Sequence, residues 1–133
     1  MPYELHLRST RYPADLNGIT HDNNPGGPLA EDIAEQLRER GYREVRVVES
    51  EPLWLVEVGT GKQRLTIVVL LFEPHDIRAQ ALWIASLESA LSLWGRWRKK
   101  PEDAAVLALA KALEASARAI KDLRVVRRKG DWP

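Results

Sequence analysis

The side chains that could carry out acid–base or metal chemistry are few and widely spaced. Two of the three histidines directly precede an aspartate, giving His21-Asp22 and His75-Asp76. If these pairs met in the folded protein, they could hold a metal ion or act as a general base. Their spacing does not require this, because neither pair lies in an H-x-x-x-H frame. We therefore interpret both pairs as loop residues with local side-chain hydrogen bonds.

Other reactive motifs are missing from the sequence. The chain has no cysteine, and no serine lies in a G-x-S-x-G setting. The segment Gly59-Thr60-Gly61-Lys62 superficially resembles a phosphate-binding loop, which needs a strand before it and a helix after it. Here a strand is expected to follow, so the segment is predicted to be a hairpin turn. We expect no catalytic residues, no metal and no cofactor, and hence a protein that is not an enzyme.

A cluster of tryptophans and cations suggests a different kind of activity. Trp94 and Trp97 lie among Arg96, Arg98 and two lysines at 99–100. Aromatic rings interleaved with cations could stack on and clamp single-stranded nucleic acid. No RNP-like pattern accompanies them, so we favour an exposed loop whose tryptophans fold back over a sheet.

Charge is unevenly distributed along the chain, although the net charge is only +1. Residues 21–60 contain nine acids and four bases, whereas residues 95–133 contain eleven bases and five acids. The acids of 44–57 are expected to form one patch, and the cations of 96–100 and 124–129 another. Opposite patches can steer a charged protein partner. The candidate partner-binding residues are Glu49, Glu51, Glu57, Trp94, Arg96, Trp97 and Arg98.

The elements that position these residues follow from hydrophobic periodicity. Residues 3–9 alternate apolar and polar side chains, which predicts a half-buried strand, and 10–27 are rich in Asn, Asp, Gly and Pro, which predicts a loop. Residues 28–40 carry Leu29, Ile33 and Leu37 on one face, which predicts a helix that Gly41 ends.

The remaining chain predicts mostly strands. Segments 44–49, 53–58 and 63–72 are predicted strands, and the last should be central because it is apolar on both faces. Their short turns imply antiparallel neighbours. Periodicity leaves 79–94 open between a helix and a fourth strand of this meander. A second helix over 101–120 and a short strand over 123–126 complete the pattern.

Together these elements predict one α+β domain over residues 1–133. The expected fold is a two-layer sandwich in which two helices cover a mainly antiparallel sheet of five to six strands, in the order β-α-β-β-β-β-α-β. The segment 92–100 is expected to be a basic, Trp-rich loop. The N-terminus does not have the form of a signal peptide, and the longest apolar run, 67–72, is too short to span a membrane. We expect a cytoplasmic protein with no membrane contact.

In pattern, the chain resembles small bacterial α/β proteins, some of them immunity-type proteins encoded beside secreted toxins. The resemblance covers most of the chain, without a single diagnostic motif. It is carried by Gly26-Gly27-Pro28-Leu29-Ala30, by Leu37 with Arg40-Gly41-Tyr42, by Glu51-Pro52-Leu53-Trp54 with Val56 and Val58, and by a strand–helix–strand unit ending near Arg124-Val125-Val126. The resemblance implies that residues 83–87 form a strand. It also implies a stoichiometric binder that plugs a partner's site, and it transfers no functional residues.

Two functional hypotheses result. The first is a non-enzymatic protein-binding domain, and more specifically an immunity-like inhibitor that neutralises a bacterial toxin. The alternative is a nucleic-acid-binding module that uses residues 94–100 and the C-terminal arginines.

Overall fold

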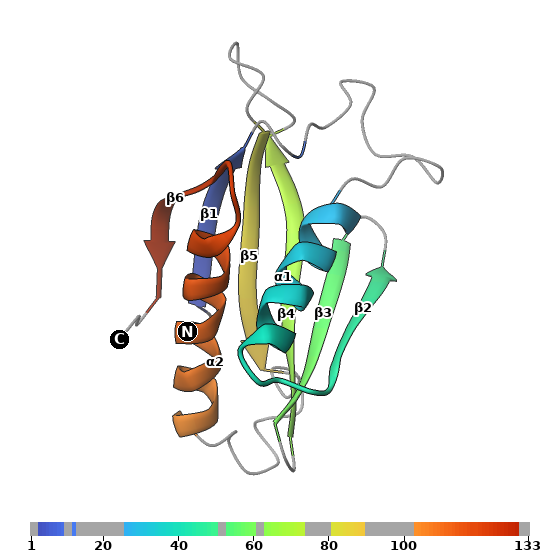
Figure 1. Ribbon diagram of the computed structural model, residues 1–133. Helices are drawn as coiled ribbons and strands as arrows, with labels where there is room; N and C mark the ends of the chain where they lie inside the picture. The colour runs from blue at the N-terminus through green and yellow to red at the C-terminus, as the bar shows by residue number, and fades with distance from the viewer. Residues whose placement is uncertain are drawn as a thin grey trace.

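The computed structural model describes residues 3–9, 12, 26–50, 53–60, 63–73, 81–89 and 103–130. Within these residues, two helices lie side by side over one face of a six-stranded sheet (Figure 1). The elements in chain order are β1 (Tyr3–Ser9), α1 (Gly27–Glu39), β2 (Val45–Ser50), β3 (Leu53–Thr60), β4 (Gln63–Glu73), β5 (Ala81–Ser89), α2 (Asp103–Ala119) and β6 (Leu123–Lys129). The two-layer α+β sandwich predicted from the sequence is confirmed, including the order of its strands and helices.

The sheet has the order β2-β3-β4-β5-β1-β6, and neighbouring strands with a described register are antiparallel. Strands β2 to β5 form the predicted meander, and β4 is an interior strand, as its apolar run predicted. The N-terminal strand β1 pairs with both β5 and β6, so the two ends of the described chain meet in the sheet. The open choice for 79–94 is resolved for residues 81–89, which form a strand.

The register divides the sheet into an inner face, which the helices cover, and an outer face. Ile67 of β4 is paired with Val56 and Leu87, and all three are buried beneath the helices. The next residue, Val68, is paired with Leu55 and Ser86 on the outer face. Because successive side chains of a strand point to opposite faces, these two rows assign the rest of each strand.

The core lies between the inner face and the two helices. Helix α1 buries the predicted Leu29, Ile33 and Leu37, and α2 buries Leu109 and Leu113. Each such side chain contributes about 1.5–3 kcal/mol when it is fully removed from water. Helix α1 packs on β2 and β3, α2 packs on β6, and the helices contact each other. Both described helices therefore cover the same face of the sheet.

Helix α1 ends as the sequence predicted. Gly41 adopts a φ of 103°, and its N–H donates to the Arg38 carbonyl while the Tyr42 N–H donates to the Leu37 carbonyl, both at 3.1 Å. These two bonds are the Schellman arrangement, which satisfies carbonyls that the helix leaves without partners.

Candidate interaction surface on the outer sheet face

Most of the predicted site residues lie outside the described part of the chain. This applies to Glu51, to Trp94, Arg96, Trp97 and Arg98 of the basic loop, and to both His-Asp pairs. The remaining two, Glu49 and Glu57, lie on the neighbouring strands β2 and β3.

The single acidic patch expected over residues 44–57 does not include both of these glutamates. Glu49 is paired with Trp54, whose side chain packs against the core on the inner face. Glu57 is paired with Arg46 on the outer face. Glu57 lies three residues after Trp54 on β3, so strand alternation turns it to the face opposite Trp54 and Glu49.

Glu57 is surrounded by arginines rather than by other acids. Its Oε2 accepts a hydrogen bond from Arg46 Nη2 at 2.7 Å and another from Arg64 Nη1 at 3.5 Å. The Glu57 side chain is 18% exposed, whereas those of the two arginines are 66% and 67% exposed. Solvent and any partner therefore meet the guanidinium groups before they meet the carboxylate.

The middle of the outer face is apolar across four strands. An antiparallel sheet with one face in water usually has polar side chains on that face. Here the register aligns Val48, Leu55 and Val68 in one row, and Leu70 with Ile84 in another. The outer strip, as we name it, consists of Val48, Leu53, Leu55, Val68, Leu70, Leu82 and Ile84. Its members on β2 and β3 and Leu70 are half-buried, whereas Val68, Leu82 and Ile84 are only 8–9% exposed.

Phe72 extends this apolar surface at the end of β4. The β4–β5 register shifts between Leu71 and Glu73, which leaves Phe72 as the extra residue of a bulge. Its side chain is 59% exposed, more than any other large apolar side chain in the described residues. Bulges of this kind often redirect a side chain at a functional edge.

Beyond β5, the outer face becomes basic. Arg8 of β1 is paired with Arg124 of β6, His6 with Arg127, and Glu4 with Lys129. We name Arg8, Arg124, Arg127 and Lys129 the basic rim. The rim adjoins the outer strip, because Arg8 is also paired with Leu82 and His6 with Ile84 on β5.

A bulge in β6 decides which cations belong to this rim. The register shifts so that Leu7 is opposite Val125 and His6 is opposite Arg127, with Val126 as the extra residue. Strict alternation from Arg124 would have turned Arg127 towards the helices. The shift instead places Arg124 and Arg127 on the outer face and sends Arg128 to the inner face.

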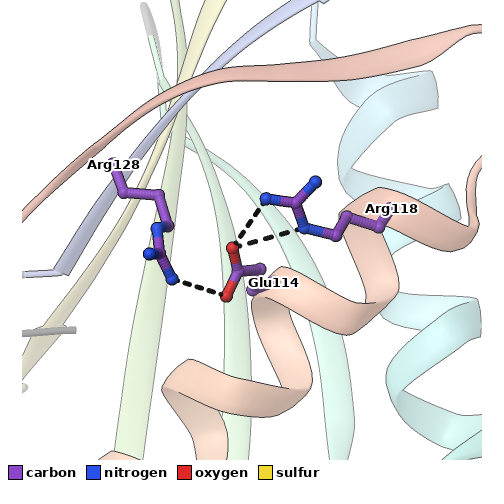
Figure 2. A network of polar contacts seen from close by, with 3 residues as sticks. All are labelled: Glu114, Arg118 and Arg128. Atoms are coloured by element: carbon purple, nitrogen blue, oxygen red, sulfur yellow. Dashed lines mark hydrogen bonds and ion pairs between the residues drawn. The ribbon is translucent and has the colours of Figure 1, made fainter. Parts of the chain in front are cut away.

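Arg128 takes part in a separate contact on the helix side (Figure 2). Its Nη1 donates to Glu114 Oε1 at 3.1 Å, while Arg118 donates to Glu114 Oε2 through Nε at 3.3 Å and Nη2 at 3.0 Å. This network joins β6 to α2, so the C-terminal basic run is divided between a structural contact and the outer rim.

His6 and Glu4 lie between the strip and the rim. His6 Nε2 is 3.3 Å from Glu4 Oε1, and their side chains are 14% and 26% exposed. Across the described ranges, no group of three or more His, Cys, Asp or Glu residues could hold a metal ion. In the same part of the chain, no helix has the length and apolar character needed to cross a membrane.

Comparison with known proteins gives no match: no family model, no curated protein and no solved structure matches the chain. The sequence did not indicate the strip as a site. It did predict a basic patch that includes the cations of 124–129, but it did not indicate that Arg8 joins them or that Arg128 leaves them. The sequence does contain a signal for the strip, since segment 63–72 is apolar on both faces. We interpreted that pattern only as evidence that the strand is interior. No pattern in the sequence predicted the bulge in β6 that places Arg124 and Arg127 on the same face.

Proposed function

We propose that the protein is a non-enzymatic protein-binding domain and that its contact surface is the outer face of the sheet. The observation that carries this proposal is the accessible part of the outer strip, on the face opposite both helices. There Val48, Leu53, Leu55 and Leu70 are half-buried, and the adjoining Phe72 is 59% exposed. Exposed apolar patches bordered by polar residues commonly mark sites of protein contact. Partner side chains covering Leu55, Leu70 and Phe72 would remove this surface from water.

The finer proposal is an immunity-like inhibitor of a bacterial toxin, acting stoichiometrically in the bacterial cytoplasm. It is motivated by the pattern resemblance described above. The absence of cysteine suits a reducing compartment. Such an inhibitor acts through shape and charge complementarity, and the outer face offers apolar and basic side chains for such a contact.

A matched pair of variants tests the protein-binding function. Leu55→Asp introduces a carboxylate into the outer strip, and Ala108→Asp introduces the same group at an exposed position on α2. Tagged wild-type protein should recover one specific protein from the native host in equimolar amount. Leu55→Asp should lose this partner, whereas Ala108→Asp should retain it. Recovery of no specific partner, or its retention by Leu55→Asp, would contradict the proposal.

The inhibitor function has its own test in the same host. A toxin gene is expected beside the gene for this protein, and co-expression of the wild type should restore growth of cells that make the toxin. The Leu55→Asp variant should not restore growth. A neighbourhood without a toxin gene, or full protection by Leu55→Asp, would count against inhibition through this face.

Nucleic-acid binding is the second candidate, and the basic rim is the observation that favours it. Sheet surfaces that bind single strands usually stack bases on aromatic rings. The outer strip itself is aliphatic, and among the described residues Phe72 of β4 is the aromatic side chain that adjoins it, so this part of the face offers one ring rather than a row of them. Binding to single- or double-stranded oligonucleotides that weakens steeply with salt would support this candidate.

A further inference from the structure

We infer that the protein forms a two-fold symmetric homodimer in which strand β2 pairs antiparallel with β2 of a second copy. The inference goes beyond the proposed function, because it uses an edge of the sheet and leaves the outer face open to a partner. In the described part of the chain, β2 has a neighbour on one side only, at the margin of the sheet opposite β6 (Figure 1). We name the side of β2 away from β3 the open edge. Such an edge presents backbone N–H and C=O groups with which another strand can pair.

The β2–β3 register fixes which backbone groups lie on the open edge. The Gly59 N–H donates to the Glu44 carbonyl at 2.8 Å, so Glu44 directs its backbone groups to β3. These groups alternate along an antiparallel strand, and those of Val45 and Val47 therefore point to the open edge. The side chains of both valines are half-buried and pack against the core on the inner face. A second strand at this edge would pair with their backbone and remove more of their apolar surface from water.

The two edges of the sheet differ in how they are protected. Proteins commonly guard an edge strand with lysine, proline or a bulge, and β6 has a lysine and a bulge. Strand β2 has no proline, no lysine and no shift of register. Arg46 is held by Glu57 of β3 at 2.7 Å, and Glu49 also has an interaction within its own chain. Arg38 of α1 covers one group of the open edge, since its Nη2 donates to the Val45 carbonyl at 3.0 Å. The middle of the open edge remains accessible to a second strand.

A second copy of β2 is complementary to this edge when the two-fold axis passes through Val47. Residues directly opposite each other in an antiparallel pair share a face, so this axis keeps the inner faces of the two copies on one side. Val47 of each copy then exchanges both N–H···O bonds with Val47 of the other. On the outer face, Arg46 of one copy comes opposite Val48 of the other, and no like charges are directly opposed there.

The charges on α1 favour a second copy over an unrelated strand. Arg38 reaches the open edge, so its side of α1 faces that edge, while Arg40 contacts α2 on the other side. Glu31 lies two turns before Arg38 on the same side, and both side chains are exposed. The two-fold axis makes the two α1 helices antiparallel, which brings Glu31 of each copy level with Arg38 of the other. Opposite charges therefore meet twice across the axis.

Association and amide exchange of the full chain test the dimer. Analytical ultracentrifugation from micromolar to millimolar protein should show a monomer–dimer equilibrium. The Val47 N–H should exchange with solvent rapidly in the monomer and slowly in the dimer. The N–H groups of Arg46 and Val48, which point to β3, should be protected at every concentration. A protein that stays monomeric over this range, or Val47 exchange that does not depend on concentration, would overturn the inference.

Charge variants test whether the second copy is bound in the inferred register. Glu31→Arg or Arg38→Glu brings like charges together across the axis, and each should weaken dimerisation by roughly tenfold or more. The double variant should restore the dimer. Lys111→Glu reverses an exposed cation on α2 and should change dimerisation little. Single variants that dimerise like the wild type, or a double variant that stays monomeric, would overturn this register.

A backbone variant and an outer-face variant separate the dimer from the proposed function. Val47→Pro removes an N–H that does not pair with β3 and should abolish the dimer, with circular dichroism establishing that the variant folds. Leu55→Asp should lose the host partner but remain dimeric. If the wild type recovers its partner and is monomeric, the homodimer fails while the protein-binding function stands. Protection of the Val47 N–H only when the host partner is bound would assign the open edge to that partner and overturn the homodimer.

Discussion

Arg128 on β6 donates to Glu114 on α2 at 3.1 Å, and this contact exists because the bulge at Val126 turns Arg128 towards the helices. The same Glu114 carboxylate also accepts from Arg118. One structural irregularity therefore anchors the last strand to the last helix and at the same time assembles the outer rim.

Replacing Glu114 with Gln should destabilise the protein modestly. The substitution removes the negative charge that holds two arginines, whose side chains are 58% and 44% exposed. Because solvent screens such pairs, the loss should be about 1 kcal/mol or less in the free energy of unfolding. Urea titration measures it. A loss that is unchanged in high salt would show that the network is not electrostatic, and Lys121→Gln on the nearby turn is the control.

Arg40 provides a second link, between the two helices. Its Nε donates to the buried Ser116 Oγ at 3.3 Å, and its Nη2 donates to the Ala115 carbonyl at 3.1 Å. The Arg40→Ala variant should lose about 1–2 kcal/mol of unfolding free energy, because two hydrogen bonds across the helix pair disappear. Arg38→Ala, two residues earlier, removes a hydrogen bond to the Val45 carbonyl instead and is the matched control. Equal stability of Arg40→Ala and wild type in urea would show that this link is dispensable.

Gly27 is constrained by a close approach rather than by its backbone angle. A Cβ at this position would lie 3.0 Å from Trp54 Cζ2 and 3.2 Å from its Cη2. The Gly27→Ala variant must push the indole aside and should cost about 1–3 kcal/mol. Gly41→Ala meets no atom within 4 Å but is strained by its φ of 103°, costing about 1–2 kcal/mol. Near-ultraviolet circular dichroism separates the two, since only Gly27→Ala should alter the Trp54 signal.

The sequence was sufficient for the layout of the fold and insufficient for its outer surface. Periodicity predicted both helices and the meander, since Leu29, Ile33 and Leu37 repeat at helical spacing and β4 is apolar throughout. Segment 79–94 stayed open because Ile84 and Leu87 fit either period, and only pairing with β1 and β4 decides for a strand over 81–89.

The candidate site depended on pairing that local patterns do not encode. Glu49 and Glu57 appeared as one acidic patch because they are close in sequence, but alternation across the β2–β3 hairpin separates them. Arg124, Arg127 and Arg128 appeared as one basic run, whereas a single extra residue at Val126 divides them between two faces. Bulges depend on long-range registers, so composition and spacing could not reveal them.

Alkaline pH should weaken the protein partly through Tyr42. Burial raises the pKa of the Tyr42 phenol above its usual value of 10.0, because the phenolate would lose water. The unfolded chain therefore ionises first, so the stability contribution is complete below pH 10 and declines as the pH rises through the folded-state pKa. Tyr42→Phe should show a smaller decline between about pH 9 and pH 11 in urea titrations. The same decline in the variant and the wild type would contradict this assignment.

The outer strip should be more important for binding than for folding. Leu55 is half-buried on the outer face, whereas its neighbour Val56 is fully buried on the inner face. Leu55→Asp keeps its carboxylate in contact with water and should cost only about 1 kcal/mol, while Val56→Asp buries a charge in the core and should cost more than about 4 kcal/mol.

Urea titration of both variants, with circular dichroism as the signal, compares these costs directly. A small loss for Leu55→Asp means that an apolar side chain at this position is not required by the fold, as expected if Leu55 serves partner contact. If Leu55→Asp were as destabilising as Val56→Asp, the strip would belong to the core, and loss of the partner in the binding experiment would report unfolding instead of a disrupted interface. The comparison of these adjacent residues therefore decides how the binding result is interpreted.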